Sequence, residues 1–244
     1  MILWIDDPAT LNDLPAALRR LARRGLEIRL SDRNYGPHTK YYPYVRLPES
    51  SASPFVTADD DVVYPKYWLE RLESAFLRQP DVVHCFRAHR IRFDGQAVAP
   101  YSSWIEPSGG QAEASDADPS LLNFATGVSG VIYPPLAGEA LAAAGDAFVT
   151  SCSTADDVWI HVQLVRSGIP THQIEATPRL FHLMQRAQAD GLWTTTNGTA
   201  NDVYIRAHYS GEVLARLLDV AGLASPRVEP ESSVRGVADV SRRG

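Results

Sequence analysis

The sequence contains few cysteines and no long apolar run. Its two cysteines, Cys85 and Cys152, show neither CxxC nor Cys/His metal spacing, which argues against a disulfide framework and against a zinc site. No apolar stretch approaches the ~20 residues that a membrane-spanning helix needs. The opening "MILWIDDP" has no basic segment before its apolar residues, unlike a signal peptide. These absences predict a cytoplasmic protein without a transmembrane segment.

Positive charge is also scarce. The 23 lysines and arginines face 29 aspartates and glutamates, giving a net charge of −6, which argues against a nucleic-acid partner. Lys40 and Lys66 are the only lysines. With 244 residues, 45% of them apolar, the chain can bury a substantial core. We predict a single domain over residues 1–223 and a disordered tail over 224–244, where large apolar residues are few.

Strand and helix patterns alternate along the chain. Apolar runs predict strands at 2–5, 26–31, 53–58 and 81–86, and helical patterns predict helices at 13–25, 65–79, 155–168 and 201–222. A turn at 93–96 and a mobile loop at 102–120 interrupt this order. The alternation is typical of an α/β fold with a mostly parallel sheet flanked by helices.

Three consecutive carboxylates end the strand at 53–58. Asp59, Asp60 and Asp61 lie in "VTADDDVVYP", directly after the apolar residues and before a helix. Ligands of open α/β sheets bind outside the carboxyl ends of the strands, and carboxylates suit Mg²⁺ or Mn²⁺, which bridge proteins to phosphates. A solvated turn that binds nothing is the alternative interpretation.

A second acidic pair, Asp156 and Asp157, begins the helix at 155–168. Two clusters of this kind suit a nucleotide-sugar glycosyltransferase, which needs a cation for its diphosphate leaving group and a base for the acceptor hydroxyl. A phosphatase of the haloacid-dehalogenase type is the second interpretation, with Asp59 as nucleophile and Asp61 as acid/base. The helix that follows the triplet almost at once, and the lack of a suitably placed lysine after a Ser/Thr strand end, argue against it.

Taken together, these motifs resemble the GT-A-fold glycosyltransferases, in particular bacterial family-2-like enzymes. The similar segments span much of residues 1–210 and occur in the family's order: "ILWID", "GLEIRLSD", "VTADDDVVYPKYWLERL", "NFATGVSGVIYPP", "ADDVWIHVQLVRSGI" and "LWTTTNGTAND". The resemblance implies transfer of a sugar from a UDP- or GDP-sugar to the hydroxyl of a glycan or another acceptor, with Mn²⁺ or Mg²⁺ as cofactor.

On the donor side, the resemblance implies that Asp60 binds the metal and that Asp61 is a further ligand. Asp59 then shares the ion or faces the nucleotide ribose. The register stays open, because Asp59-x-Asp61 also satisfies the family's DxD motif. Asp32 and Lys40 lie in the donor-site loop, where Lys40 either contacts the nucleotide or is solvated at the surface.

On the acceptor side, Asp157 matches the family's catalytic base and Asp156 orients it or binds the acceptor. Gly127 and Gly130 suggest close backbone approach near the acceptor, or a tight turn. Trp159 is a sugar platform or a core residue, and His182 is an extra metal ligand or a core residue.

In one respect the sequence departs from this family, in which a further strand precedes the one that resembles "ILWID" and holds part of the nucleotide base. The chain is therefore expected to be an N-terminally truncated GT-A domain. A central strand missing from a parallel sheet would leave backbone groups unpaired. This leaves open a degenerate GT-A module that binds a partner or glycan without turnover.

Overall fold

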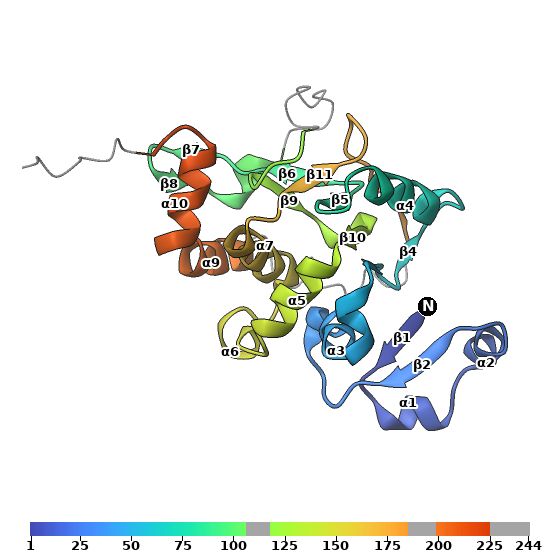
Figure 1. Cartoon of the computed structure of the whole chain (residues 1–244). Helices are drawn as coiled ribbons and strands as arrows, with labels where there is room; N and C mark the ends of the chain where they lie inside the picture. Colours follow the sequence, from blue (N-terminus) through green and yellow to red (C-terminus); the bar gives the residue numbers. More distant parts are fainter. Residues whose placement is uncertain (106–117, 185–198, 225–244) are drawn as a thin grey trace, which may run out of the picture.

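The computed structural model describes residues 1–105, 118–184 and 199–224 (Figure 1). Most of the predicted loop at 102–120, residues 225–244 of the predicted tail and residues 192–198 of "LWTTTNGTAND" lie outside the described residues. Within the described ranges, the helices are all too short or too polar to cross a membrane.

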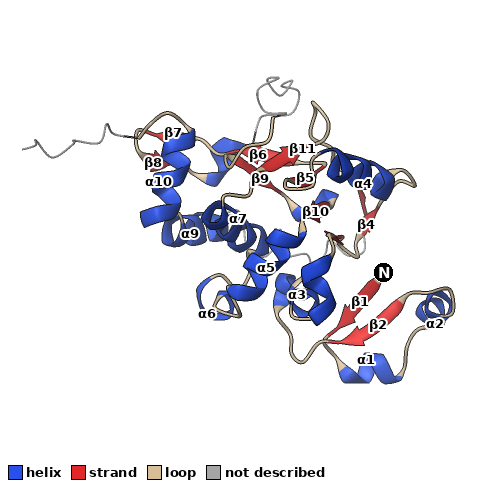
Figure 2. Cartoon of the chain, viewed as in Figure 1, coloured by secondary structure: helices blue, strands red, loops and turns tan. Residues whose placement is uncertain are grey.

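A four-stranded sheet forms the centre of the protein (Figure 2). Its strands lie in the order β11 (Thr171–Gln173), β5 (Val83–Cys85), β10 (Val131–Tyr133) and β3 (Phe55–Thr57). β11 runs parallel to β5, whereas β10 is antiparallel to both of its neighbours. The sheet is therefore mixed in direction.

Helices cover both faces of this sheet. Successive residues of a strand point to opposite faces, so each strand contributes side chains to both contacts. Ile132 of β10 packs with Leu72 of α4 (Trp68–Arg78). Val131 and Tyr133 lie in the larger core cluster on the other face, together with residues of α5 (Pro135–Ala143) and α7 (Asp156–Ser167). The α/β class predicted from the alternating pattern is confirmed.

A separate parallel pair forms at the N-terminus. β1 (Ile2–Ile5) pairs with β2 (Glu27–Leu30), and α1 (Pro8–Asn12) and α2 (Ala16–Ala22) connect them. The sequence analysis did not predict α1, which Asp7 caps by accepting the N–H groups of Ala9 and Thr10. This pair lies beside α3 (Tyr42–Val45) in Figure 1, and within the described ranges it forms a sheet of its own.

The remaining strand pairs are short and antiparallel. β6 (Ala88–Arg90) pairs with β9 (Asn123–Ala125), β4 (Val62–Val63) with β12 (His182–Leu183), and β7 (Phe93–Asp94) with β8 (Ala97–Val98). The last pair is the hairpin predicted at 93–96, with Gly95 at φ 60°. Among the described strand pairs, β1–β2 and β11–β5 are parallel and the others are antiparallel. The mostly parallel arrangement expected from the sequence is therefore limited to these two pairs.

Two predicted segments differ from the structure. The helix expected at 201–222 is divided into α9 (Thr199–His208) and α10 (Gly211–Val220), because Ser210 is extended and Gly211 has a positive φ of 54°. At the start of the expected mobile loop, Trp104 ends the 3₁₀ turn η3 (Tyr101–Trp104) and is 1% exposed. Burial of this indole fixes the segment up to that point.

Candidate functional site

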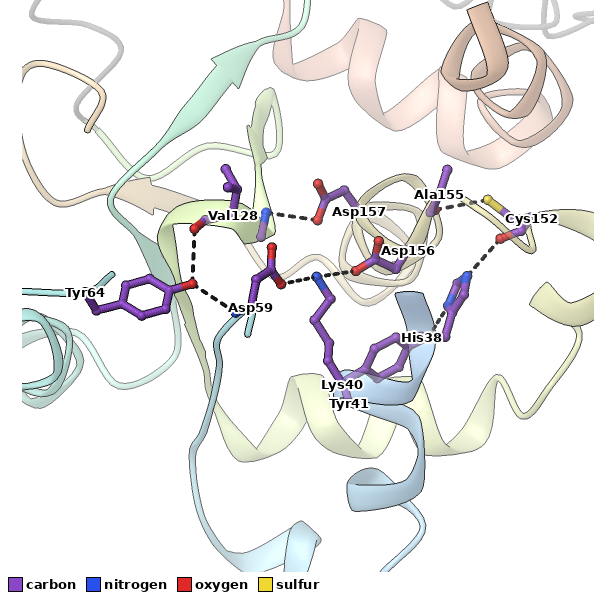
Figure 3. A network of polar contacts seen from close by, with 11 residues as sticks. His38, Lys40, Tyr41, Asp59, Tyr64, Val128, Cys152, Ala155, Asp156 and Asp157 are labelled. Carbon is purple, nitrogen blue, oxygen red and sulfur yellow. Dashed lines mark hydrogen bonds and ion pairs between the residues drawn. The ribbon is translucent and has the colours of Figure 1, made fainter. Parts of the chain in front are cut away.

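The two acidic clusters meet at one lysine (Figure 3). Lys40 ends the 3₁₀ turn η1 (Gly36–Lys40), and its Nζ lies 2.7 Å from Oδ1 of Asp59 and 3.0 Å from Oδ2 of Asp156. The side chains of all three residues are largely buried. Lys40 is therefore a cation inside the carboxylate cluster, and the alternative of a solvated surface lysine is wrong.

Asp59 reaches the cluster from the loop that follows β3. Its backbone N–H donates to the hydroxyl of Tyr64 at 2.9 Å, and this hydroxyl donates to the carbonyl of Val128 at 3.1 Å. Tyr64 thereby joins the acidic loop to the turn η5 (Gly127–Ser129). The loop is held by backbone contacts, so the position of the Asp59 carboxylate does not depend on the lysine alone.

Asp156 and Asp157 occupy the first turn of α7, where the helix dipole favours negative charge. Successive helix residues point about 100° apart, and the two carboxylates have different partners. Asp156 contacts Lys40, whereas Oδ1 of Asp157 accepts the N–H of Gly127 at 3.0 Å. Both predicted acids therefore belong to one site, with distinct contacts.

The backbone of Gly127 lies close to two charged groups of the site. A Cβ at this position would be 3.0 Å from Nζ of Lys40 and 3.1 Å from Oδ1 of Asp157, so these side chains would have to shift by a few tenths of an ångström. Gly127 also begins the turn η5, so a close approach and a tight turn both apply here, and its position near an acceptor stays a prediction.

The charges of the site act on one another's protonation. Burial lowers the pKa of Lys40, but the attraction of Asp156, Asp59 and Asp157 exceeds that effect and raises it well above the usual value. Burial and the negative charge of Asp156 raise the pKa of Asp157, against the opposing effects of Lys40 and the Gly127 N–H. Lys40 stays charged, and Asp157 titrates closer to neutral pH than an ordinary aspartate.

A buried histidine anchors the turn that carries Lys40. Nε2 of His38 donates to the carbonyl of Cys152 at 2.8 Å, because a carbonyl can only accept, and Nδ1 accepts the Tyr41 hydroxyl proton at 3.0 Å. The ring stacks on Phe148 of α6 (Phe148–Ser151) with centroids 3.9 Å apart. Burial lowers the pKa of His38, which favours this neutral form. Sequence patterns gave no signal for the contacts with Cys152 and Phe148, which lie 114 and 110 positions further along the chain.

The three side chains of the acidic triplet differ in exposure. Asp59 and Asp61 are partly buried, whereas Asp60 is exposed and makes no contact with the cluster. Burial and the neighbouring charge of Asp59 raise the pKa of Asp61. Asp59 and Asp61 therefore face inward and Asp60 faces solvent, while the register of a DxD motif stays a prediction. Burial alternates along residues 55–61, but β3 ends at Thr57 and Asp60 and Asp61 lie in a turn, so a strand period does not predict this orientation.

Other predicted site residues lie outside the Lys40 cluster. Asp32 accepts from Arg46 at 2.9 Å and from the Tyr35 hydroxyl at 3.1 Å, at the edge of a shallow pocket. Trp159 is 4% exposed and packs edge-on against the ring of His208, as a core residue does. His182 is exposed in β12.

Gly130, the second glycine expected near the acceptor, has a structural role in this arrangement. Its φ is +87°, and a Cβ on it would lie 2.3 Å from Cζ2 of Trp68. The indole of Trp68 covers this glycine and donates its Nε1–H to the carbonyl of Ser129 at 2.9 Å. The tight-turn interpretation therefore accounts for Gly130.

The predicted divalent metal does not fit these residues as they are arranged. Across residues 1–105, 118–184 and 199–224, no three Asp, Glu, His or Cys side chains converge as metal ligands. The ammonium of Lys40 lies between the two carboxylates that would bind the ion. No protein-family model, no curated protein and no solved structure matches the chain in comparisons with known proteins.

Proposed function

We propose that the protein is a glycosyltransferase with a GT-A-like domain that moves a sugar from a nucleotide-sugar to an acceptor hydroxyl. The observation that carries the proposal is the convergence of Asp59, Asp156 and Asp157. They come from one loop and one helix about 100 residues apart, yet Asp59 and Asp156 contact the same ammonium group and the charge of Asp157 helps to raise its pKa. Such a site offers a base and a cation side by side, which is what this transfer requires.

Asp157 is the base in this proposal. Its carboxylate takes the proton of the acceptor hydroxyl while that oxygen attacks the anomeric carbon, and direct displacement inverts the configuration. The raised pKa of Asp157 suits the role, because a general base works best when its pKa is near the working pH. The Gly127 N–H fixes one carboxylate oxygen and leaves the other for the acceptor.

The donor is expected on the Lys40 side of the site. As the sugar–phosphate bond breaks, negative charge grows on the departing diphosphate, and a nearby cation stabilises it. The cation that the described residues provide is Lys40. A requirement for Mn²⁺ or Mg²⁺ stays a prediction from the resemblance alone, and no step is assigned to such an ion.

One contact favours the phosphatase alternative. In that interpretation Asp59 is the nucleophile, and a lysine beside it would hold the carboxylate in place, as Lys40 does at 2.7 Å. The helix α4, which follows the triplet almost at once, argues the other way, as it did in the sequence. The phosphatase would release phosphate from simple esters and would not need a sugar nucleotide.

The proposal is tested by calorimetric binding of UDP and GDP, followed by transfer assays with sugars of the preferred nucleotide. Asp157→Asn should reduce turnover at least a hundredfold and leave nucleotide affinity unchanged, because the base is lost and the donor side is intact. Asp219→Asn removes an exposed carboxylate of α10 and serves as the matched control. Full turnover by Asp157→Asn would refute its role. Binding of neither nucleotide would favour the non-catalytic module.

A further inference from the structure

The cation of this site belongs to the chain itself. We propose that the ammonium of Lys40 occupies the divalent-cation position between Asp59 and Asp156, so that a divalent ion can bind these carboxylates only by displacing Lys40. The proposal concerns the occupancy of the site and does not depend on which reaction the protein catalyses.

The surroundings of Lys40 are shaped to hold an ammonium group. The turn η1 is anchored on both sides of the lysine's position, by His38 against Cys152 and by the buried residues Tyr41 and Tyr42. The side chain then extends past the backbone of Gly127, where a Cβ would lie 3.0 Å from Nζ and would press on the ammonium. A lysine that was paired by chance at the surface would have neither feature.

The competition follows from charge and from shared oxygens. The ammonium contacts one oxygen of Asp59 and one of Asp156, so the three groups carry a net charge of about −1 by formal counting. A divalent ion is attracted to this charge, but hard cations need several oxygen ligands at short range. Within the parts of the chain that the structure describes, no set of three ligating side chains is assembled for it.

Because the chain has only two lysines, the displacement can be observed in the wild-type protein. Lysine labelled with ¹³C at Cε gives one signal from Lys40 and one from Lys66, which is exposed and serves as an internal control. Lys66→Arg assigns the two signals. Titration with Mg²⁺ should move the Lys40 signal to saturation and leave the Lys66 signal in place. Saturable Mg²⁺ binding by calorimetry with an unmoved Lys40 signal would overturn the proposal.

Two variants test the competition from the opposite direction, with Mn²⁺ affinity measured by electron paramagnetic resonance of the free ion. Lys40→Met keeps the apolar stem and removes the charge, so it should bind Mn²⁺ at least tenfold more tightly than the wild type. Lys40→Arg keeps the charge and should bind no more tightly than the wild type. Equal affinity of Lys40→Met and wild type would contradict the proposal. If Lys40→Met does not fold, the Mg²⁺ titration of the wild-type protein tests the proposal by itself: a moved Lys40 signal supports it, and Mg²⁺ binding with an unmoved signal overturns it.

Discussion

Replacing Gly130 by alanine should destabilise the protein strongly, for two separable reasons. The first is the backbone, because φ at this residue is +87°, where a residue with a Cβ is strained by about 1–3 kcal/mol. The second is the indole of Trp68, whose Cζ2 would lie 2.3 Å from the new methyl group. The indole must move, and its hydrogen bond to the Ser129 carbonyl is then lost.

The expected magnitude follows from these two effects. Overpacking costs about 1–3 kcal/mol, and a lost hydrogen bond costs about 1 kcal/mol. The alanine recovers about 0.4–1 kcal/mol because it restricts the unfolded chain. We therefore expect Gly130→Ala to lower the free energy of unfolding by about 2–7 kcal/mol, which corresponds to a fall of roughly 4–28 °C in Tm for a domain of this size.

Urea unfolding followed by circular dichroism measures this change, and Gly95→Ala is the matched control. Gly95 also has a positive φ, of 60°, but a Cβ there would meet nothing within 4 Å. Its loss should be limited to about 1 kcal/mol of backbone strain. Trp68→Ala on the Gly130→Ala background should restore about 1 kcal/mol or more relative to additive effects. Equal losses at Gly95 and Gly130 would refute the proposed clash.

Two further predictions concern charge. Asp59→Asn should cost about 1–3 kcal/mol in urea unfolding because it leaves Lys40 half-paired in a partly buried site, whereas Asp60→Asn should change stability by less than about 0.5 kcal/mol; the reverse order would contradict the stabilising role of the Asp59–Lys40 contact. Burial lowers the pKa of His161 to about 4 from its usual 6.5, so the neutral form stabilises the fold above pH 6.5, and up to about 3 kcal/mol should be lost as the pH falls towards 4. His161→Gln should flatten this pH dependence of urea unfolding, and an unchanged slope would show that other groups cause it.

The elements that place the site could be predicted because their sequence signals are local. Apolar runs gave β1, β2, β3 and β5, and the helix from Asp156 ends where Gly168 takes a positive φ of 68°. The position of acids after a strand and at a helix start also indicated one common site. For the strands and the helix, the residues that decide the structure lie within a few positions of one another.

The partners within the site could not be predicted in this way. Lys40 finds its carboxylates 19 and 116 positions away, and no periodicity reports such a contact. Trp159 could be a platform or a core residue until the rings of Phe148 and His208 were seen around it. Asp60 is a further case, because it lies in a turn three residues beyond β3, where the two-residue period of a strand no longer applies.

The adjacency of Asp156 and Asp157 on α7 links the two sides of the site. One acid contacts the lysine and the next contacts the Gly127 backbone, so the first turn of the helix is held from both directions. A ligand that draws Lys40 away from Asp156 removes one of these restraints. If its binding changes the affinity of a second ligand at Asp157 by some factor, the second ligand must change the affinity of the first by the same factor. The shortest covalent route for such coupling is the single peptide unit between the two acids.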